Sequence, residues 1–542
     1  MPVFRLRVVF LALVAQASFL YAQDLAQRVD QVFADLDHPH SPGCALGVVR
    51  DGRFVRRKSY GEASLELGVP ISPRSVFYVG SISKQFTAAS VVLAAEQGYL
   101  SLEDDVHKYI PELPDYGHRI TLRQMLNQTS GFRDFFDLLY FSGLDAASFN
   151  SPPAILKLVA RQNELNNTPG DEWIYSNTNY FLLGIVLERA AKMPLSRFAA
   201  ENIFRPLSMT HTRFYDDASV VVPGRVAAYD SGPNGSFRVD WSTTYAVVGG
   251  GGVMTTVDDL LAWDNNFYLN RLGKGTLVKE LQAPGILNDG GRTVYGMGLF
   301  RGNYRGLPTI EHDGALFGYR ADLLRFPEQK FSVICLCNLA GADPEDRARQ
   351  VADLYLNGQF PPSGASASPA GGLPDPAIFA GRYLDQRSHT IDSFTAKDGL
   401  LWAWGSALRR KTANQFYDHF GDIVTFTSSH GQMSAALDVN DNTYFAGQRI
   451  SDIHLDESKL RAFTGNYRSR ELDGTLDISL EKGKLVLRIG ANSPLALNPI
   501  AQNEFEAEGS FSILFFRDEN GRVTSLRAFS PSARGLAFDR VH

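Results

Sequence analysis

Cysteine is scarce in this chain of 542 residues, which contains only Cys44, Cys335 and Cys337. An odd and small number of cysteines excludes a disulfide-rich framework of the kind that stabilises small secreted domains. Cys335 and Cys337 lie two residues apart in a strand-like run, so they share one face of that strand and are expected to be small core hydrophobes. No further ligand cluster stands near them, and no metal site is predicted.

An excess of positive charge is also lacking. The chain has 53 Lys and Arg against 59 Asp and Glu, a formal net charge of -6. It therefore lacks the broad cationic surface that a phosphate backbone attracts, and we expect no nucleic-acid partner. Its composition, 44% hydrophobic and 21% charged, is typical of globular proteins, and its length suggests about three to four domains.

Long apolar runs are absent except near the N-terminus. Arg5 and Arg7 precede an apolar run over 8–20, which ends in Tyr21-Ala22-Gln23. This order is typical of a secretory signal with cleavage after Ala22; an uncleaved membrane anchor is the alternative, although the run is short for a bilayer span. We expect residues 1–22 to be a signal peptide, and the mature protein to be periplasmic or secreted without a stable membrane anchor.

Residues 24–357 alternate strand-like and helix-like patterns. Two strand-like runs, 44–50 and 54–61, flank Asp51-Gly52, which is a strong hairpin signal. Helical patterns follow, and strands return over about 293–338. Strands at both ends with helices between them predict an α+β domain, an antiparallel sheet flanked by helices.

The composition changes after residue 357. Residues 358–376 are rich in Pro, Gly, Ala and Ser and are expected to form a linker. Beyond them, Phe379-Ala-Gly-Arg-Tyr383 recurs 84 positions later as Phe463-Thr-Gly-Asn-Tyr467. We predict two small antiparallel β modules, barrels or sandwiches, over 377–455 and 456–542.

The chain contains two Ser-x-x-Lys sequences, Ser81 to Lys84 and Ser479 to Lys482. The second falls in a strand and turn pattern, where residues three apart point to opposite faces. The first begins a helix, where the same spacing stacks the two side chains on one face. There Ser81 can act as a nucleophile and Lys84 as its base if burial lowers the lysine pKa. A helix cap and a surface charge are the alternative.

Two more stretches carry groups that suit such a site. Tyr175 and Asn177 precede a helix, and a Tyr beside a Lys can be acidified to serve as a base while an Asn donates to a substrate carbonyl. His312-Asp-Gly314 follows a strand, and Gly314 would let a substrate lie against the strand edge. Each stretch alone is also common loop or turn material.

Together, Ser81-Ile-Ser-Lys84, Tyr175-Ser-Asn177 and His312-Asp-Gly314 resemble the three ordered motifs of the serine β-lactamase and penicillin-binding-protein superfamily, in its class C-like branch. The resemblance covers about residues 30–357. It implies an acyl-enzyme at Ser81, proton transfer by Lys84 and Tyr175, and substrate binding by Asn177, His312 and Gly314. It also implies an oxyanion hole from the backbone N–H groups of Ser81 and Ala315, with no metal or organic cofactor.

Two positions depart from the family pattern. The third motif begins with His312 where β-lactamases have a Lys that holds a carboxylate, and imidazole is a weaker, conditional anchor. The resemblance to D-aminopeptidases, which carry His there, favours small peptides with a free amino end, amides or esters as substrates. Gln128 stands where a His is usual, at a structural position.

We therefore predict an exported serine peptidase or amidase that acts on D-amino-acid peptides or related amides. An esterase, a β-lactamase and a catalytically silent sensor of peptidoglycan fragments are the alternatives. Two features stay open: the aromatic run 132–141 can wall the acyl pocket or form a core helix, and Arg320 can replace the missing lysine charge or form a surface ion pair. The sequence does not predict the oligomeric state or whether the β modules reach the active site.

Overall fold

The computed structural model describes residues 23–144, 151–240, 245–361, 373–418, 422–439, 442–507 and 511–541. The expected signal peptide, 1–22, and most of the expected linker lie outside these residues. Within the described part, no helix is long and apolar enough to cross a bilayer.

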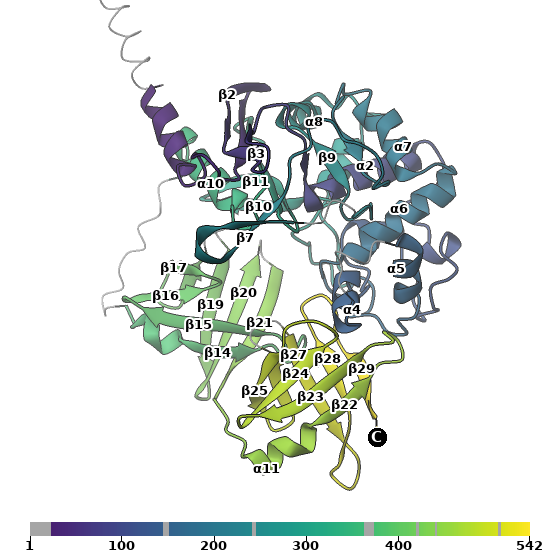
Figure 1. Ribbon diagram of the computed structural model, residues 1–542, viewed down its shortest axis with the longest axis vertical. Coiled ribbons are helices and arrows are strands. Elements are labelled where there is room, and N and C mark those ends of the chain that lie inside the picture. Colours follow the sequence, from purple (N-terminus) through teal and green to yellow (C-terminus); the bar gives the residue numbers. More distant parts are fainter. Residues whose placement is uncertain are drawn as a thin grey trace, which may run out of the picture.

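A mixed α+β domain comes first, as predicted, and its centre is an antiparallel sheet (Figure 1). In the described residues the sheet has six strands in the order β10-β11-β12-β13-β1-β2. A turn at Asp51-Gly52 joins β1 and β2, with both residues at positive φ. The strands are β1 (Cys44–Arg50), β2 (Arg53–Tyr60), β10 (Phe300–Tyr304), β11 (Leu307–Leu316), β12 (Tyr319–Phe326) and β13 (Phe331–Cys337). Short strands lie around it: β3 (Glu62–Ser64), β4 (Val69–Pro70), β5 (Phe77–Tyr78), β6 (Arg213–Phe214), β7 (Tyr229–Ser231), β8 (Phe237–Val239) and β9 (Val253–Thr255).

Helices cover both faces of this sheet, because alternate residues of its strands feed two separate apolar clusters. Leu323, Ile334 and Leu336 face the larger cluster, which includes α2, α6 and α8. Leu324 and Cys335 face the smaller one, which includes α10 and a helix over 23–32. The helices are α2 (Ser83–Glu96), α3 (Leu122–Leu126), α4 (Phe135–Phe141), α5 (Pro152–Val159), α6 (Asn177–Ala191), α7 (Leu195–Ala199), α8 (Val257–Leu269), α9 (Leu277–Gln282) and α10 (Pro344–Tyr355).

The cysteines behave differently from the prediction. Cys44 on β1 lies opposite Cys337 on β13, and the two form a disulfide across 293 residues of sequence. The interpretation of Cys337 as a simple core hydrophobe was wrong, because the pairing of β1 with β13 could not be foreseen from local patterns. Cys335 is a buried free thiol, with its Sγ 3.7 Å from the Cys337 Sγ.

The two C-terminal modules are closed barrels. In the described residues each has eight antiparallel strands, β14–β21 in barrel 1 and β22–β29 in barrel 2. The repeated sequence builds the same corner in both, because Tyr383 Oη donates to Phe379 O and Tyr467 Oη donates to Phe463 O, each at 2.8 Å. Gly381 and Gly465 adopt nearly equal φ angles, 146° and 145°.

The strands of barrel 1 are β14 (Gly381–Leu384), β15 (Ile391–Lys397), β16 (Leu400–Ala403), β17 (Ser406–Arg410), β18 (Gln415–Tyr417), β19 (Ile423–Ser429), β20 (Gln432–Val439) and β21 (Asn442–Ile450). The helix α11 (Glu457–Leu460) precedes barrel 2. The strands of barrel 2 are β22 (Gly465–Arg468), β23 (Thr475–Glu481), β24 (Lys484–Ile489), β25 (Leu495–Ala501), β26 (Glu504–Ala507), β27 (Phe511–Arg517), β28 (Val523–Phe529) and β29 (Leu536–Val541).

Barrel 2 packs directly on the α+β domain near α4 (Figure 1). The ring of Phe511 on β27 lies 4.9 Å from that of Phe141 on α4, edge to face. Arg133, whose side chain is 2% exposed, reaches Glu471 at 3.1 Å and the carbonyl of Arg534 at 3.1 Å. A buried cation with partners in both parts fixes barrel 2 against α4.

Candidate active site

Ser81 and Lys84 lie at the start of the buried helix α2. Ser81 is the middle residue of a short 3₁₀ turn, η1 (Gly80–Ile82), which leads into α2. Lys84 follows one turn later, and its Nζ lies 2.9 Å from the Ser81 Oγ. The spacing therefore brings the two side chains together as the helical pattern predicts.

Lys84 is completely buried and surrounded by acceptors. Its Nζ donates to Asn177 Oδ1 and to Gly250 O, each at 2.8 Å. Burial lowers the pKa of Lys84 to about 7, although the carboxylates of Asp134 and Asp313 act in the opposite direction. A substantial neutral fraction at neutral pH gives Lys84 the capacity to accept a proton from Ser81.

Tyr175 completes this group from the segment before α6. Its ring centroid lies 4.8 Å from the Lys84 Nζ. Burial raises the pKa of Tyr175 well above its ordinary value, and its hydrogen bond with Ser81 lowers it only partly. The expected acidification by Lys84 is thus outweighed, because burial disfavours the phenolate, and Tyr175 is a neutral phenol at neutral pH.

Asn177 is the first residue of α6, and both ends of its amide have partners. Oδ1 accepts from Lys84, while Nδ2 donates to Asp134 Oδ2 at 2.8 Å. Gln128 Oε1, which stands where a His is usual in the family, accepts from Ser176 N at 3.0 Å and from Asn179 Nδ2 at 2.7 Å. Gln128 thus orders the segment that carries Tyr175 and Asn177.

Two glycines allow η1 to lie against β11. A Cβ on Gly80, whose φ is +50°, would stand 2.6 Å from Ala315 N, and a Cβ on Gly314 would stand 2.1 Å from Val79 O. No larger residue fits at either position without separating the two segments. Their close approach places the backbone N–H groups of Ser81 and Ala315 on neighbouring segments, the arrangement that an oxyanion hole requires.

His312 differs from its expected chemistry. It is fully buried, its Nε2 lies 2.8 Å from Tyr295 Oη, and its Nδ1 lies 2.7 Å from Asp313 O. Burial, reinforced by the charge of Lys84, lowers the pKa of His312 to about 3. The prediction that its imidazole titrates near neutrality and anchors a carboxylate was wrong, since burial keeps the ring neutral and both nitrogens have partners.

A narrow apolar pocket of about 30 Å³ lies at Ser81. Phe135 and Phe136, from the aromatic run 132–141, line it together with Tyr245, Val247 and Leu316. Most of the same run is the buried helix α4, so the run contributes both to the core and to the lining of this pocket.

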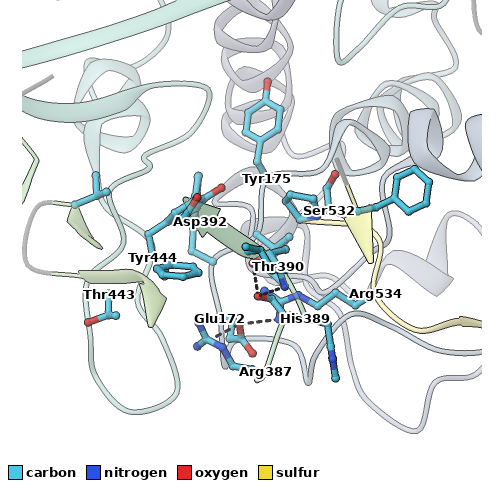
Figure 2. Close-up of a pocket in the computed structure, with 18 of the residues that line it drawn as sticks. Glu172, Tyr175, Arg387, His389, Thr390, Asp392, Thr443, Tyr444, Ser532 and Arg534 are labelled. Atoms are coloured by element: carbon cyan, nitrogen blue, oxygen red, sulfur yellow. Dashed lines mark hydrogen bonds and ion pairs between the residues drawn. The ribbon is translucent and has the colours of Figure 1, made fainter. Parts of the chain in front are cut away.

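A larger cavity of about 440 Å³ lies behind Tyr175, where the α+β domain meets both barrels (Figure 2). Glu172 contacts Arg387 of barrel 1 at 3.4 Å and Arg534 of barrel 2 at 3.0 Å. Trp173 packs against Tyr444 of barrel 1, with ring centroids 5.7 Å apart. Both barrels therefore contact the segment that leads to Tyr175, a question that the sequence left open.

Other sequence candidates lie elsewhere. Ser479 on β23 hydrogen-bonds Glu481 and Arg488. Lys482 lies in the turn that follows this strand. Arg320 Nη1 donates to the backbone carbonyls of Phe317 and Tyr319, at 2.6 and 2.8 Å.

Sequence reasoning missed Asp134 and the carbonyl of Gly250. The helix-cap position of Asp134 before an apolar helix was a readable signal. Its contact with Asn177 was not, because those residues are 43 positions apart.

The sequence model of the beta-lactamase family matches residues 29–356, more than half of the chain. The chain belongs to the beta-lactamase family. Membership in this family, with the site described above, makes it a serine hydrolase.

A relative from Brucella anthropi, named D-aminopeptidase, is 25% identical over 526 residues, covering 92% of this chain and 95% of the relative. Among solved structures, the octameric penicillin-binding protein homologue from Pyrococcus abyssi has a TM-score of 0.54 at 18% identity, covering 88% of this chain and 98% of that one. A D-amino acid amidase from Ochrobactrum anthropi SV3 has a TM-score of 0.52 at 21% identity, covering 62% and 99%. These structures share the fold.

Proposed function

We propose that this protein is an exported serine peptidase or amidase that forms an acyl-enzyme at Ser81 and acts on D-amino-acid peptides or related amides. The observation that carries the proposal is the buried Lys84, whose pKa is lowered to about 7 and whose Nζ lies 2.9 Å from the Ser81 Oγ. The D-aminopeptidase relative, which aligns along nearly the whole chain including both barrels, supports the substrate class.

In the proposed reaction, neutral Lys84 accepts the Ser81 proton as Oγ attacks the substrate carbonyl. The N–H groups of Ser81 and Ala315 stabilise the negative charge on the carbonyl oxygen; one such donor is typically worth roughly 10²–10³ in kcat. The neutral Tyr175 phenol can then donate a proton to the leaving amine and be reprotonated from Lys84. Water attacks the ester by the same route in reverse, which releases the acid and restores Ser81.

The third motif favours substrates without a carboxylate beside the scissile bond. His312 is neutral and enclosed, so it offers no positive charge at the place where β-lactamases use a lysine. Gly314 and Ala315 present strand backbone instead, against which a substrate can lie as an added strand. This supports an amide without a neighbouring carboxylate over a β-lactam; an ester hydrolase on the same scaffold is the second candidate.

A substrate panel tests the proposal: p-nitroanilides of D- and L-alanine, p-nitrophenyl acetate and nitrocefin, each with wild type, Ser81→Ala and Ser479→Ala. We expect hydrolysis of the D-anilide above the L-anilide, loss of turnover in Ser81→Ala and wild-type turnover in Ser479→Ala. Turnover of the ester alone would refute the amidase proposal, and folded protein that neither turns over nor labels with a fluorophosphonate would favour the sensor.

The rate should also follow the charge of Lys84. Because the neutral amine is the base, kcat/KM should fall as pH drops through about 7 and level off above it. A pH profile of the fluorophosphonate labelling rate measures this without a known substrate, and a rate that rises toward acid would contradict the assignment of Lys84.

A further inference from the structure

Asp134 is a buried carboxylate whose two oxygens serve different elements. Oδ1 accepts from Phe136 N at 2.8 Å, which caps α4. Oδ2 accepts from both the backbone N and the Nδ2 of Asn177, the first residue of α6. Asn177 in turn presents Oδ1 to the Lys84 Nζ at 2.8 Å. A helix cap needs only one oxygen, so the second oxygen of Asp134 fixes the residue that holds Lys84.

The same segment is tied to barrel 2. The backbone N of Asp134 donates to Ser532 O at 2.9 Å, in the turn 530–535 between β28 and β29. One helical turn after Asp134, Asp137 Oδ2 accepts from Ser530 Oγ at 2.7 Å and Ser532 Oγ at 2.6 Å. Barrel 2 therefore supplies the hydrogen bonds for one carboxylate of a buried pair, and the other carboxylate faces the catalytic group.

We propose that Asp134 is a positioning residue through which the 530–535 turn of barrel 2 sets the orientation of Asn177 and the charge state of Lys84. The inference rests on the proposed role of Lys84 as the base for Ser81. It assigns barrel 2 a part in catalysis although, among the described residues, the lining of the small pocket at Ser81 includes none from a barrel.

The charges near Asp134 and Lys84 predict the direction in which each substitution should shift the pKa of Lys84. Burial and the neighbouring Asp137 carboxylate together raise the pKa of Asp134 to about 6, against the opposing effect of its hydrogen bonds from Asn177 and Phe136. Burial likewise raises the pKa of Asp137, while the hydroxyls of Ser532 and Ser530 lower it. The titratable groups that face Asp134 or Lys84 from the surrounding elements are Asp137, Tyr175, Tyr180, Tyr245, His312 and Asp313.

The test is the pH dependence of fluorophosphonate labelling at Ser81 in the full chain. Asp134→Asn removes a negative charge that raises the Lys84 pKa. The acid limb of the profile, where the labelling rate falls as pH drops, should therefore move to lower pH. An amide cannot accept from every donor that Asp134 now satisfies, so the plateau rate should fall roughly 10–100-fold through misplacement of Asn177 and Lys84. Asp134→Glu keeps the charge but displaces it, so the plateau should fall while the limb stays near its wild-type position.

Asp137→Asn should move the limb the other way. Without the Asp137 charge, Asp134 is more readily ionised, which favours protonated Lys84 and shifts the limb to higher pH. Opposite shifts in Asp134→Asn and Asp137→Asn are expected only if the two carboxylates act on Lys84 in series. If Asp134→Asn proves unstable, Asp137→Asn and the double variant Ser530→Ala/Ser532→Ala carry the test. The double variant removes two hydrogen bonds that lower the pKa of Asp137, so it favours neutral Asp137 and should shift the acid limb in the same direction as Asp137→Asn.

Asp343→Asn is the matched control. Asp343 caps α10 through Asp346 N at 3.1 Å, on the opposite face of the sheet from Ser81. It should leave both limb and plateau unchanged. The proposal is overturned if the acid limbs of Asp134→Asn and Asp137→Asn coincide with that of wild type, whatever their plateau rates. If folded wild-type protein is not labelled at Ser81, the proposed function itself is refuted instead.

Discussion

The two barrels share one construction and differ in how they join the rest of the molecule. In barrel 1, Phe426 packs on Phe379 and Tyr383 at 4.8 and 5.7 Å. In barrel 2, Phe515 packs on Phe463 and Tyr467 at 4.7 and 5.7 Å. The interior of barrel 1 forms its own apolar cluster, whereas that of barrel 2 joins the main cluster of the α+β domain. Equal folds can thus have unequal roles, because the role depends on which core a module shares.

The largest effect should come from matched truncations of the two barrel interiors. Phe426→Ala and Phe515→Ala each remove a fully packed ring, which typically costs about 3–5 kcal/mol of stability. Only Phe515→Ala should lower the labelling rate of Ser81, because the core of barrel 2 is continuous with that of the α+β domain. Chemical denaturation and fluorophosphonate labelling measure the two effects. Equal labelling rates in both variants would remove the distinction between the barrels.

Arg133→Ala should have the next largest effect. It leaves Glu471 without its buried cation and removes hydrogen bonds to the carbonyls of Arg534 and Gly535, so we expect a loss of about 3 kcal/mol. Arg387→Ala, at the more exposed contact between barrel 1 and Glu172, should cost less than about 1 kcal/mol. Denaturation midpoints compare them, and a larger loss in Arg387→Ala would reverse the proposed order.

The smallest difference in stability between the two barrels should come from the repeated corner. Tyr383→Phe and Tyr467→Phe each remove one buried hydrogen bond and should each cost about 1 kcal/mol. Hydrogen exchange should show looser amides in the mutated barrel, and only Tyr467→Phe should extend this loosening to α4. Protection of α4 that is the same in both variants would show that the barrels couple equally to the site.

Features encoded by local patterns could be predicted from the sequence. Asp51-Gly52 predicted the β1–β2 hairpin, the recurrence of Phe379-Ala-Gly-Arg-Tyr383 predicted paired β modules, and helical spacing predicted the contact of Ser81 with Lys84. Each depends on residues close together in the chain or on a repeat within it.

Features that depend on tertiary contact could not be predicted. The partner of Cys44 lies 293 residues away, and the neutral state of His312 follows from its burial among Tyr175, Tyr295 and Phe300, which surround it only in the folded chain. The sequence indicates Asp134 as a helix cap, but its second carboxylate oxygen gains a hydrogen-bond partner only when α6 lies beside α4 in the fold.

The close approach of Gly80 to β11 also bears on how this scaffold can be diversified. A single added methyl group at Gly80 or Gly314 would meet backbone atoms at 2.6 or 2.1 Å, so libraries that randomise these two codons would consist mostly of inactive clones. Phe136 and Leu316 also line the small pocket at Ser81, and smaller side chains at these two positions should enlarge it without moving the backbone of Ser81 and Ala315. New substrate ranges on this fold should therefore arise from changes in the pocket-lining side chains and not from changes at Gly80 or Gly314.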